Sequence, residues 1–282
     1  MDVLVSAQWL EDHLRDPGLR VFDATVQVRQ RRLWTPAVRT GEREWRREHI
    51  PGSAFADLLA MSDPAQPRRS MTFPSAERFG ATIGRLGVSN DNDVVLYDRR
   101  ENMWAARLWW MLRAFGFDNA AVLDGGWNAW VSGGFPTCTR PCAYPPAAFV
   151  TTPRPGLVVG KREVLDAVGD PTVCLVNALG RRQHRGEVNE YGRRGHIPGS
   201  RNLTAWEVLD RETRCYRPLP ELRRKAAGVL DAPHIITYCG AGAAACSIAH
   251  VLVRLGHDDV SVYDGGLLEW CADRSLPLEL GS

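Results

Sequence analysis

The segment around Cys239 combines a nucleophilic side chain with a loop suited to holding an anion. Residues 234–244 read HIITYCGAGAA, an apolar run that ends at Cys239 and is followed by small residues. Backbone N–H groups of a tight loop and of a helix N-terminus stabilise an anion, and such settings lower a cysteine pKa from about 8.5 to about 3.5–7.5. We predict that Cys239 is a catalytic nucleophile. Its predicted binding loop comprises Gly240, Ala241, Gly242, Ala243 and Ala244.

An alternative interpretation makes Cys239 a buried structural residue, because free cysteine usually behaves as a small hydrophobe. A second copy of the same pattern argues against this alternative. Residues 95–98 (VLYD) match residues 236–239 (ITYC), so Asp98 stands at the position of Cys239. A fold that accepts Asp at this position does not require a thiol there. The thiol is therefore predicted to serve chemistry.

Three further pairs of segments recur in the same order. Residues 49–53 and 196–200 both read HIPGS, VLDGG at 122–126 recurs as VYDGG at 262–266, and FDA at 22–24 matches VNA at 176–178. The offsets drift between 140 and 154 residues, which indicates two copies of one fold with loops of different length. We predict a first domain over residues 4–137 and a second over 157–279. A proline-rich linker over 138–156 is predicted to join them.

Each copy alternates short apolar runs with helical patterns. In the second copy, 173–178, 234–238 and 260–263 are predicted strands, and 243–255 is a predicted helix. The first copy repeats that helix at 104–115. Buried strands that alternate with helices indicate an α/β fold, with a parallel sheet and helices on both faces in each domain. Functional residues of such sheets lie at the carboxyl ends of strands, which singles out Asp98 and Cys239.

The motifs together resemble those of tandem-domain rhodanese-type sulfurtransferases, the thiosulfate and 3-mercaptopyruvate sulfurtransferase family, over nearly the whole chain. The resemblance rests on the two HIPGS segments, the DGG-x3-W segments at 124–130 and 264–270, residues 95–98, the segment 107–116 and the loop after Cys239. In that family the first domain is catalytically empty and often carries Asp where the second carries Cys. The resemblance implies two rhodanese-like domains and ping-pong transfer of a sulfane sulfur through a persulfide on Cys239.

The resemblance also implies a small sulfur donor, 3-mercaptopyruvate or thiosulfate, and a thiophilic acceptor such as cyanide or a thiol. The loop lacks the basic side chains common in the thiosulfate type. It keeps both glycines of the mercaptopyruvate type, Cys-Gly-Ser-Gly-Val-Thr, with Ala241 in place of the Ser. That type places a donor-binding Arg where Gln183 stands, beside Arg182. We expect Arg182 and Gln183 to contact the donor, and 3-mercaptopyruvate to be the better donor. Other arginines that could clamp the donor carboxylate are Arg185, Arg193 and Arg194.

Other functions stay open beside this one. A cysteine phosphatase requires a longer loop that ends in an Arg, which binds the phosphoryl oxygens. This chain has Ala245 and Cys246 at those positions, which argues against a phosphatase. A non-catalytic rhodanese-like module that carries sulfur or binds a partner is a further alternative. A sulfurtransferase with an atypical donor is the last, because Ala241 lacks the hydroxyl of the family's Ser.

Composition limits the partners. The 282 residues carry 35 Lys and Arg against 33 Asp and Glu, a net charge of +2, which argues against a nucleic-acid or membrane partner. There is no N-terminal signal pattern and no apolar run long enough to span a membrane. Seven cysteines, an odd number without paired C-x-x-C spacing, indicate reduced thiols in the cytoplasm and no metal site. We expect a cytoplasmic monomer without metal, nucleotide or flavin.

His49 and His196 are tempting as catalytic bases. Each precedes Pro-Gly in a copy of HIPGS, and the first copy has no thiol at the equivalent of residue 239. A side chain repeated in an empty domain is better explained by a hydrogen bond to the backbone. Both histidines are therefore predicted to fix turns.

Overall fold

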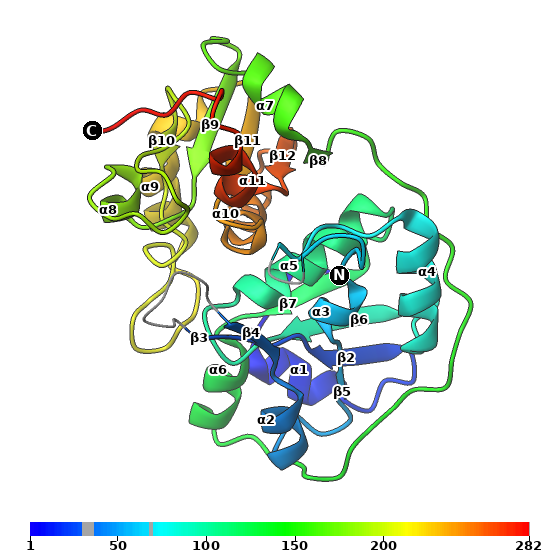
Figure 1. Ribbon diagram of the computed structural model, residues 1–282. Coiled ribbons are helices and arrows are strands. Elements are labelled where there is room, and N and C mark those ends of the chain that lie inside the picture. Colours follow the sequence, from blue (N-terminus) through cyan, green and yellow to red (C-terminus); the bar gives the residue numbers. More distant parts are fainter. Residues whose placement is uncertain (30–36, 68–69, 282) are drawn as a thin grey trace. The chain divides into compact units, whose positions relative to one another are not determined.

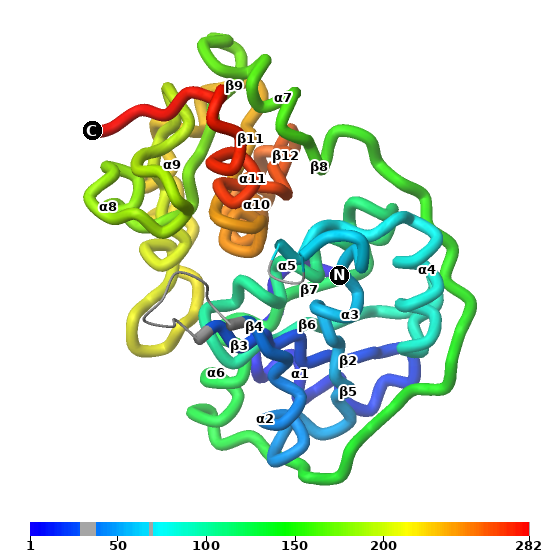
Figure 2. The backbone as a smooth tube through the Cα atoms, in the orientation of Figure 1, coloured from blue at the N-terminus to red at the C-terminus, as the bar shows by residue number. Residues whose placement is uncertain are grey.

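The structure is a computed structural model that describes residues 1–29, 37–67 and 70–281. The chain forms two compact units (Figures 1 and 2). The first unit comprises Met1–Arg154 together with Asp210–Tyr216, and the second comprises Pro155–Leu209 with Arg217–Ser282. Each unit contains a five-stranded sheet, so the repeat in the sequence corresponds to two units of similar construction.

The sheet of the first unit has the strand order β1-β7-β6-β2-β5, and its neighbouring strands pair in parallel. Its strands are β1 (Leu4–Val5), β2 (Leu19–Asp23), β5 (Ala54–Phe55), β6 (Asp93–Tyr97) and β7 (Ala120–Leu123). A separate antiparallel pair is formed by β3 (Val26–Arg29) and β4 (Ala37–Thr40). The central strand β6 ends directly before Asp98, so Asp98 lies at the carboxyl edge of the sheet.

Helices cover both faces of this sheet. They are α1 (Ala7–His13), α2 (Glu42–Arg47), α3 (Leu58–Met61), α4 (Ala76–Arg85), α5 (Met103–Ala114) and α6 (Gly126–Ser132). Val95 of β6 shares a buried cluster with Trp130 of α6. Its neighbour Leu96 points to the opposite face and is buried as well. The Trp109 indole of α5 donates a hydrogen bond of 2.9 Å to the Ala120 carbonyl of β7.

The second unit repeats this topology, with the strand order β10-β9-β11-β12-β8 and parallel pairing throughout. Its strands are β8 (Val158–Val159), β9 (Val173–Asn177), β10 (Arg201–Asn202), β11 (His234–Tyr238) and β12 (Val260–Tyr263). Its helices are α7 (Lys161–Asp166), α8 (Arg181–His184), α9 (Leu219–Leu230), α10 (Ala243–Arg254) and α11 (Gly266–Ala272). The central strand β11 takes the place that β6 has in the first unit.

Two contacts show that the second sheet also has helices on both faces. The Thr237 hydroxyl of β11 donates to the Ala245 carbonyl of α10, at 3.2 Å. The next residue, Tyr238, points to the other face, where its register partner Tyr263 packs edge-on against Trp270 of α11. The predicted fold class, an α/β fold of two tandem parallel sheets with helices on both faces, is confirmed. The three strands and the one helix predicted in the second copy end within one residue of those observed.

The proline-rich segment is extended and bound to the first unit. Residues 139–156 contain no helix or strand, and Figure 2 shows them running along that unit. Ala147 N–H donates to the Gly84 carbonyl, and Thr152 N–H donates to the Phe115 carbonyl, both at 2.8 Å. These hydrogen bonds tie the segment to the ends of α4 and α5.

The segment Asp210–Tyr216, from the second half of the sequence, clusters with the first unit. The Asn102 side-chain amide donates to the Arg214 carbonyl at 3.0 Å, and Tyr216 N–H donates to the Asp124 carboxylate at 2.7 Å. A Cβ on Gly125 would lie 2.8 Å from the Cys215 sulfur. The segment therefore packs on the turn that follows β7.

Within the described parts of the chain, no helix is long and apolar enough to cross a membrane.

Candidate active site

Cys239 follows the central strand β11 of the second unit directly, at the carboxyl edge of the parallel sheet. The residue is buried, with 3% of its surface exposed. Three residues lead from it to α10, whose cap residue Gly242 has φ +76°. Because side-chain-bearing residues rarely adopt this φ, glycine at 242 permits the tight turn that brings the start of α10 close to Cys239.

Hydrogen bonds from α11 fix the carbonyl side of the loop after Cys239. Leu267 N–H donates to the Cys239 carbonyl at 2.8 Å, and Leu268 N–H donates to the Gly240 carbonyl at 3.0 Å. In a trans peptide the C=O and the following N–H point in opposite directions. The N–H groups of Gly240 and Ala241 therefore point away from α11 and are left for an anion on the loop's other side.

Glycine in the DGG motif makes this contact between α11 and the loop sterically feasible. Gly266 has φ +54°, and a Cβ there would lie 2.5 Å from the Cys239 carbonyl oxygen. The first unit repeats the arrangement. Gly126 has φ +52°, its Cβ would lie 2.3 Å from the Asp98 carbonyl oxygen, and Trp127 N–H donates to that oxygen at 3.0 Å. The repeated motif thus supports the loop at residues 98 and 239.

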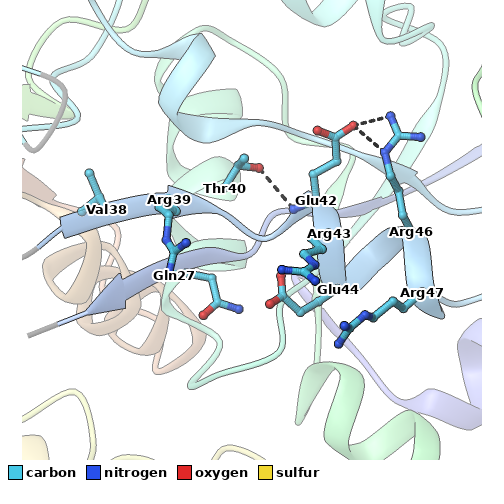
Figure 3. Close-up of a pocket in the computed structure, with 9 residues that line it drawn as sticks. All are labelled: Gln27, Val38, Arg39, Thr40, Glu42, Arg43, Glu44, Arg46 and Arg47. Atoms are coloured by element: carbon cyan, nitrogen blue, oxygen red, sulfur yellow. Dashed lines mark hydrogen bonds and ion pairs between the residues drawn. The ribbon is translucent and has the colours of Figure 1, made fainter.

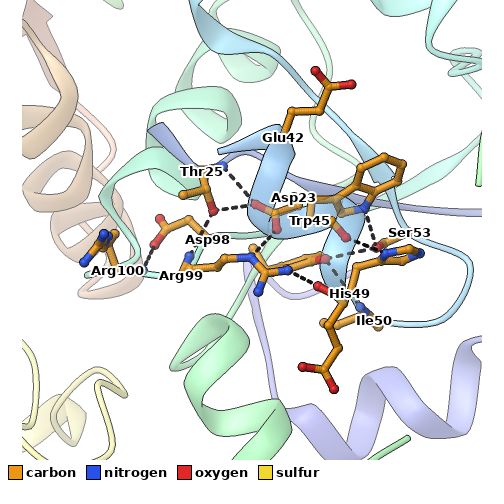
Figure 4. Close-up of polar contacts among 12 residues, drawn as sticks. Asp23, Thr25, Glu42, Trp45, His49, Ile50, Ser53, Asp98, Arg99 and Arg100 are labelled. Carbon is orange, nitrogen blue, oxygen red and sulfur yellow. Dashed lines mark hydrogen bonds and ion pairs between the residues drawn. The ribbon is translucent and has the colours of Figure 1, made fainter. Parts of the chain in front are cut away.

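In the first unit the Asp98 carboxylate is bound by main-chain N–H groups of the corresponding loop, and Figure 4 shows its contact with Arg100. One carboxylate oxygen accepts N–H bonds from Arg100 at 2.7 Å and Asn102 at 3.2 Å. The other accepts from Trp104 at 2.9 Å and Ala105 at 3.0 Å. Burial raises the pKa of Asp98 to about 6, against the N–H bonds from Ala105 and Arg100, which lower it. The loop is thus an anion cradle made of main-chain amides.

The surroundings of Asp98 are polar as well (Figure 4). Arg99 binds the buried Asp23 carboxylate at 2.9 Å and lies over the Trp127 ring at 4.1 Å from its centroid. Thr25 donates its hydroxyl to the same carboxylate at 2.5 Å. Burial raises the pKa of Asp23, while Arg99 lowers it. The first unit therefore stabilises its loop with internal charges and places no thiol there.

Tyr191 rests on the Cys239 loop, although the sequence analysis did not single it out. A Cβ on Gly240 would lie 2.3 Å from the Tyr191 hydroxyl oxygen. Burial raises the pKa of Tyr191 well above its ordinary value, and the charge of Cys239 raises it further, so the hydroxyl keeps its proton. Tyr191 belongs to a loop far from Cys239 in sequence, and no spacing pattern connects the two.

The two residues expected to contact the donor lie on α8 in different settings. Arg182 is exposed and pairs with Glu187, with 3.2 Å between nitrogen and oxygen. Gln183 is buried, and its side-chain amide donates to the Gly195 carbonyl at 3.2 Å and accepts from Asn177 at 3.3 Å. Gln183 therefore links α8 to the loop that follows, whereas the Arg182 side chain extends into solvent.

The three alternative arginines are also on the surface of the second unit. Arg185 and Glu187 are 3.9 Å apart. Arg193 is half-buried and donates to the Asp273 carbonyl at 3.2 Å. Burial raises the pKa of Cys271 on α11, and the positive charge of Arg193 opposes that rise. Arg194 is exposed. Arg193 is thus tied to the end of the helix that supports the Cys239 loop.

The two histidines fix turns, as predicted. His49 is buried, and its ring nitrogens bond the Trp45 carbonyl at 2.7 Å and the Arg140 carbonyl at 3.1 Å. His196 is buried and bonds the His184 carbonyl at 2.7 Å. Both rings are thus engaged with backbone, and the prediction that they are structural is confirmed.

A depression of about 780 Å³ lies over β4 and α2 of the first unit (Figure 3). Glu42 and Arg46 form an ion pair of 2.6 Å there. The lining residues are Gln27, Val38, Arg39, Thr40, Glu42, Arg43, Glu44, Arg46 and Arg47. This lining holds no thiol.

The seven cysteines, all among the described residues, form no disulfide, and Cys239, Cys246 and Cys271 are buried. In the residues that the structure describes, no cluster of three or more His, Cys, Asp or Glu side chains is placed to hold a metal ion.

Comparison with protein families identifies the chain's relatives. The model described as "Rhodanese-like domain" matches residues 6–133 and 182–273. The chain belongs to the rhodanese family. The two matched segments include Asp98 and Cys239 respectively, and the resemblance predicted from the motifs is confirmed.

Individual relatives agree with this assignment. Thiosulfate sulfurtransferase of Mus musculus is 32% identical over 279 residues, which cover 95% of this chain and 91% of the mouse protein. The 3-mercaptopyruvate sulfurtransferase of Escherichia coli (strain K12) is 33% identical over 282 residues, which cover 98% of this chain and 97% of the Escherichia coli protein. The crystal structure of SseA from Escherichia coli, described as a 3-mercaptopyruvate sulfotransferase with the rhodanese fold, superposes with a TM-score of 0.82 at 31% identity. The superposition covers 94% of this chain and 99% of SseA.

Proposed function

We propose that this protein is a sulfurtransferase that moves a sulfane sulfur from a small donor to a thiophilic acceptor through a persulfide on Cys239. The observation that carries the proposal is the anion cradle. The loop that binds the Asp98 carboxylate in the first unit recurs around a thiol in the second. Main-chain amides of residues 240–244 stabilise the thiolate and the persulfide anion in the same way. The sulfurtransferase names of the mouse and Escherichia coli relatives support the same reaction class.

The first half-reaction begins when the Cys239 thiolate attacks the sulfane sulfur of the donor. With thiosulfate, the S–S bond breaks, sulfite leaves with the bonding electron pair, and Cys239 becomes a persulfide anion. With 3-mercaptopyruvate, the C–S bond breaks and the carbon keeps the electron pair. That carbon takes up a proton equivalent to the one lost by the transferred S–H, and pyruvate leaves.

The second half-reaction restores the enzyme. A cyanide ion or a thiolate attacks the outer sulfur of the persulfide, and the S–S bond breaks. Cys239 leaves with the electron pair as a thiolate, while the acceptor becomes thiocyanate or a new persulfide. No group besides the thiol and its amides is required for this exchange.

Among small donors, the proposal favours 3-mercaptopyruvate over thiosulfate. Residues 240–244 carry no cationic side chain, so a thiosulfate dianion loses charge-assisted contacts in the loop. A mercaptopyruvate carboxylate is a monoanion held farther from the sulfur. Steady-state kinetics with both donors and cyanide should give the higher kcat/KM for 3-mercaptopyruvate. Equal or better turnover with thiosulfate would overturn this preference, and turnover with neither would favour an atypical donor.

Donor binding is proposed for the α8 region. Arg182 carries the exposed guanidinium that can grip a carboxylate, while Gln183 holds α8 against the next loop. Arg193, two residues after Tyr191, is the alternative cation. The amides of the Cys239 loop complete the proposed site, with Gly240, Ala241, Gly242, Ala243 and Ala244 as its members.

Replacement of the thiol tests the function directly. Cys239→Ser keeps a side chain of similar size but removes the nucleophile, so sulfur transfer should vanish while the melting temperature stays near that of the wild type. The matched control is Cys138→Ser, at a partly exposed thiol of the first unit, which should keep full turnover. Full sulfurtransferase activity of the Cys239→Ser protein would contradict the proposal.

The same proposal includes a cytoplasmic monomer. Cysteines without disulfides suit a reducing compartment. Both half-reactions use groups of the second unit alone, so the proposed chemistry requires no partner subunit.

A further inference from the structure

The Cys239 loop has no polar side chain of its own that could assist an anion on the sulfur. Residues 240–244 are Gly-Ala-Gly-Ala-Ala, which offer main-chain N–H groups and no hydroxyl. In the first unit the corresponding loop carries arginines, a glutamate and an asparagine. A side chain that assists the sulfur must therefore reach it from another element.

Tyr191 is positioned to do so. Its hydroxyl oxygen and ring atom Cζ would lie 2.3 Å and 2.6 Å from a Cβ on Gly240, the residue next to the thiol. Gly240 thus leaves the space that the phenol occupies. In the described residues the Tyr191 hydroxyl makes no hydrogen bond, so its proton is available to a ligand.

The charges around Tyr191 keep that proton in place. The phenol faces Cys239, Glu190 of its own loop and Cys271 of α11, and negative charge on each raises the Tyr191 pKa beyond the effect of burial. Burial raises the pKa of Cys271, and the positive charge of Arg193, on the same loop as Tyr191, opposes that rise. Tyr191 is therefore a neutral hydrogen-bond donor throughout the working pH range.

We propose that the Tyr191 hydroxyl donates a hydrogen bond to the sulfur anion on Cys239, and so supplies the hydroxyl that the loop lacks. It acts on the thiolate of the free enzyme and on the outer sulfur of the persulfide. Only the second of these roles rests on the proposed function. Because both donors yield the same persulfide, Tyr191 serves sulfur transfer from either one.

The test measures the thiolate without any sulfur donor. The rate of Cys239 alkylation by iodoacetamide is followed against pH, with the modified peptide quantified by mass spectrometry. Tyr191→Phe removes only the hydroxyl and should raise the apparent thiol pKa by about one unit, a tenfold lower thiolate fraction at pH values below the pKa. Gly240→Ala, whose Cβ displaces the phenol, should shift the profile in the same direction.

Tyr144→Phe is the matched control. Tyr144 donates to the Gly52 carbonyl at 2.7 Å and accepts from Val21 N–H at 2.9 Å, so its loss should lower the melting temperature and leave the Cys239 profile unchanged. A Tyr191→Phe profile that superposes on the wild type would overturn the proposal, even with normal sulfur transfer. A shifted profile in a protein that transfers no sulfur would instead uphold it and refute the proposed function.

Discussion

The contact between Gly266 and the Cys239 loop yields a prediction that separates catalysis from folding. A Cβ at residue 266 would lie 2.5 Å from the Cys239 carbonyl oxygen, whereas ordinary contact begins near 3.4 Å. Gly266→Ala must therefore displace the loop or α11 by about 0.9 Å, and it also places alanine at φ +54°. The left-handed backbone alone costs about 1–2 kcal/mol of stability.

The displacement acts directly on the nucleophile. A misplacement of about 1 Å can reduce turnover roughly 100-fold, because the amides and the thiolate lose their alignment with the donor. We expect Gly266→Ala to reduce kcat for 3-mercaptopyruvate and cyanide by about that factor. Steady-state kinetics and thermal unfolding of the same preparation measure the two effects.

The first unit supplies a matched control. Gly126→Ala meets the Asp98 carbonyl oxygen at 2.3 Å with φ +52°, a similar clash in a loop without a thiol. It should lower the melting temperature about as much as Gly266→Ala does and leave kcat near the wild-type value. Wild-type turnover in Gly266→Ala would refute the reasoning, as would an equal loss of turnover in both variants.

Two further predictions concern donor binding and pH. Arg182→Ala should raise the donor KM, with a loss of about 1.5–3 kcal/mol in kcat/KM. The control Arg181→Ala, which breaks an exposed ion pair with Glu207, should leave the donor KM unchanged. Unchanged kinetics for Arg182→Ala would move the donor-binding role to Arg193. Burial raises the Asp98 pKa from 3.8 to about 6, so the folded protein binds this proton more tightly than the unfolded chain does. Stability should therefore fall by about 3 kcal/mol as pH rises from about 3 to about 7, and Asp98→Asn should abolish that part of the fall. Urea unfolding across this range measures it, and identical pH slopes for the two proteins would contradict the assignment.

The repeat made most of the fold predictable. Four collinear segment pairs and alternating apolar runs were enough to place three strands and one helix of the second copy within one residue. They also placed Asp98 and Cys239 at equivalent strand ends. The reason is physical, since buried parallel strands and the glycines that end helices leave strong local patterns.

Features set by tertiary contact left no such pattern. Nothing in the residue types indicates that Asp210–Tyr216 packs with the first unit, because its hydrogen bonds use main-chain groups of Arg214 and Tyr216. The contact of Tyr191 with Gly240 could not be predicted from the sequence either, because it depends on how a distant loop folds back onto the Cys239 loop. The burial of Gln183 likewise follows from its bonds to Gly195 and Asn177.

The measurement closest to the central claim is the mass of the protein after donor treatment. Incubation with 3-mercaptopyruvate or thiosulfate, followed by removal of the donor, should add one sulfur, about 32 Da, at the nucleophilic thiol. Peptide mapping should place it on Cys239, and cyanide should remove it with release of one equivalent of thiocyanate. An unmodified Cys239 after treatment with either donor, or sulfur carried only by other cysteines, would contradict the account.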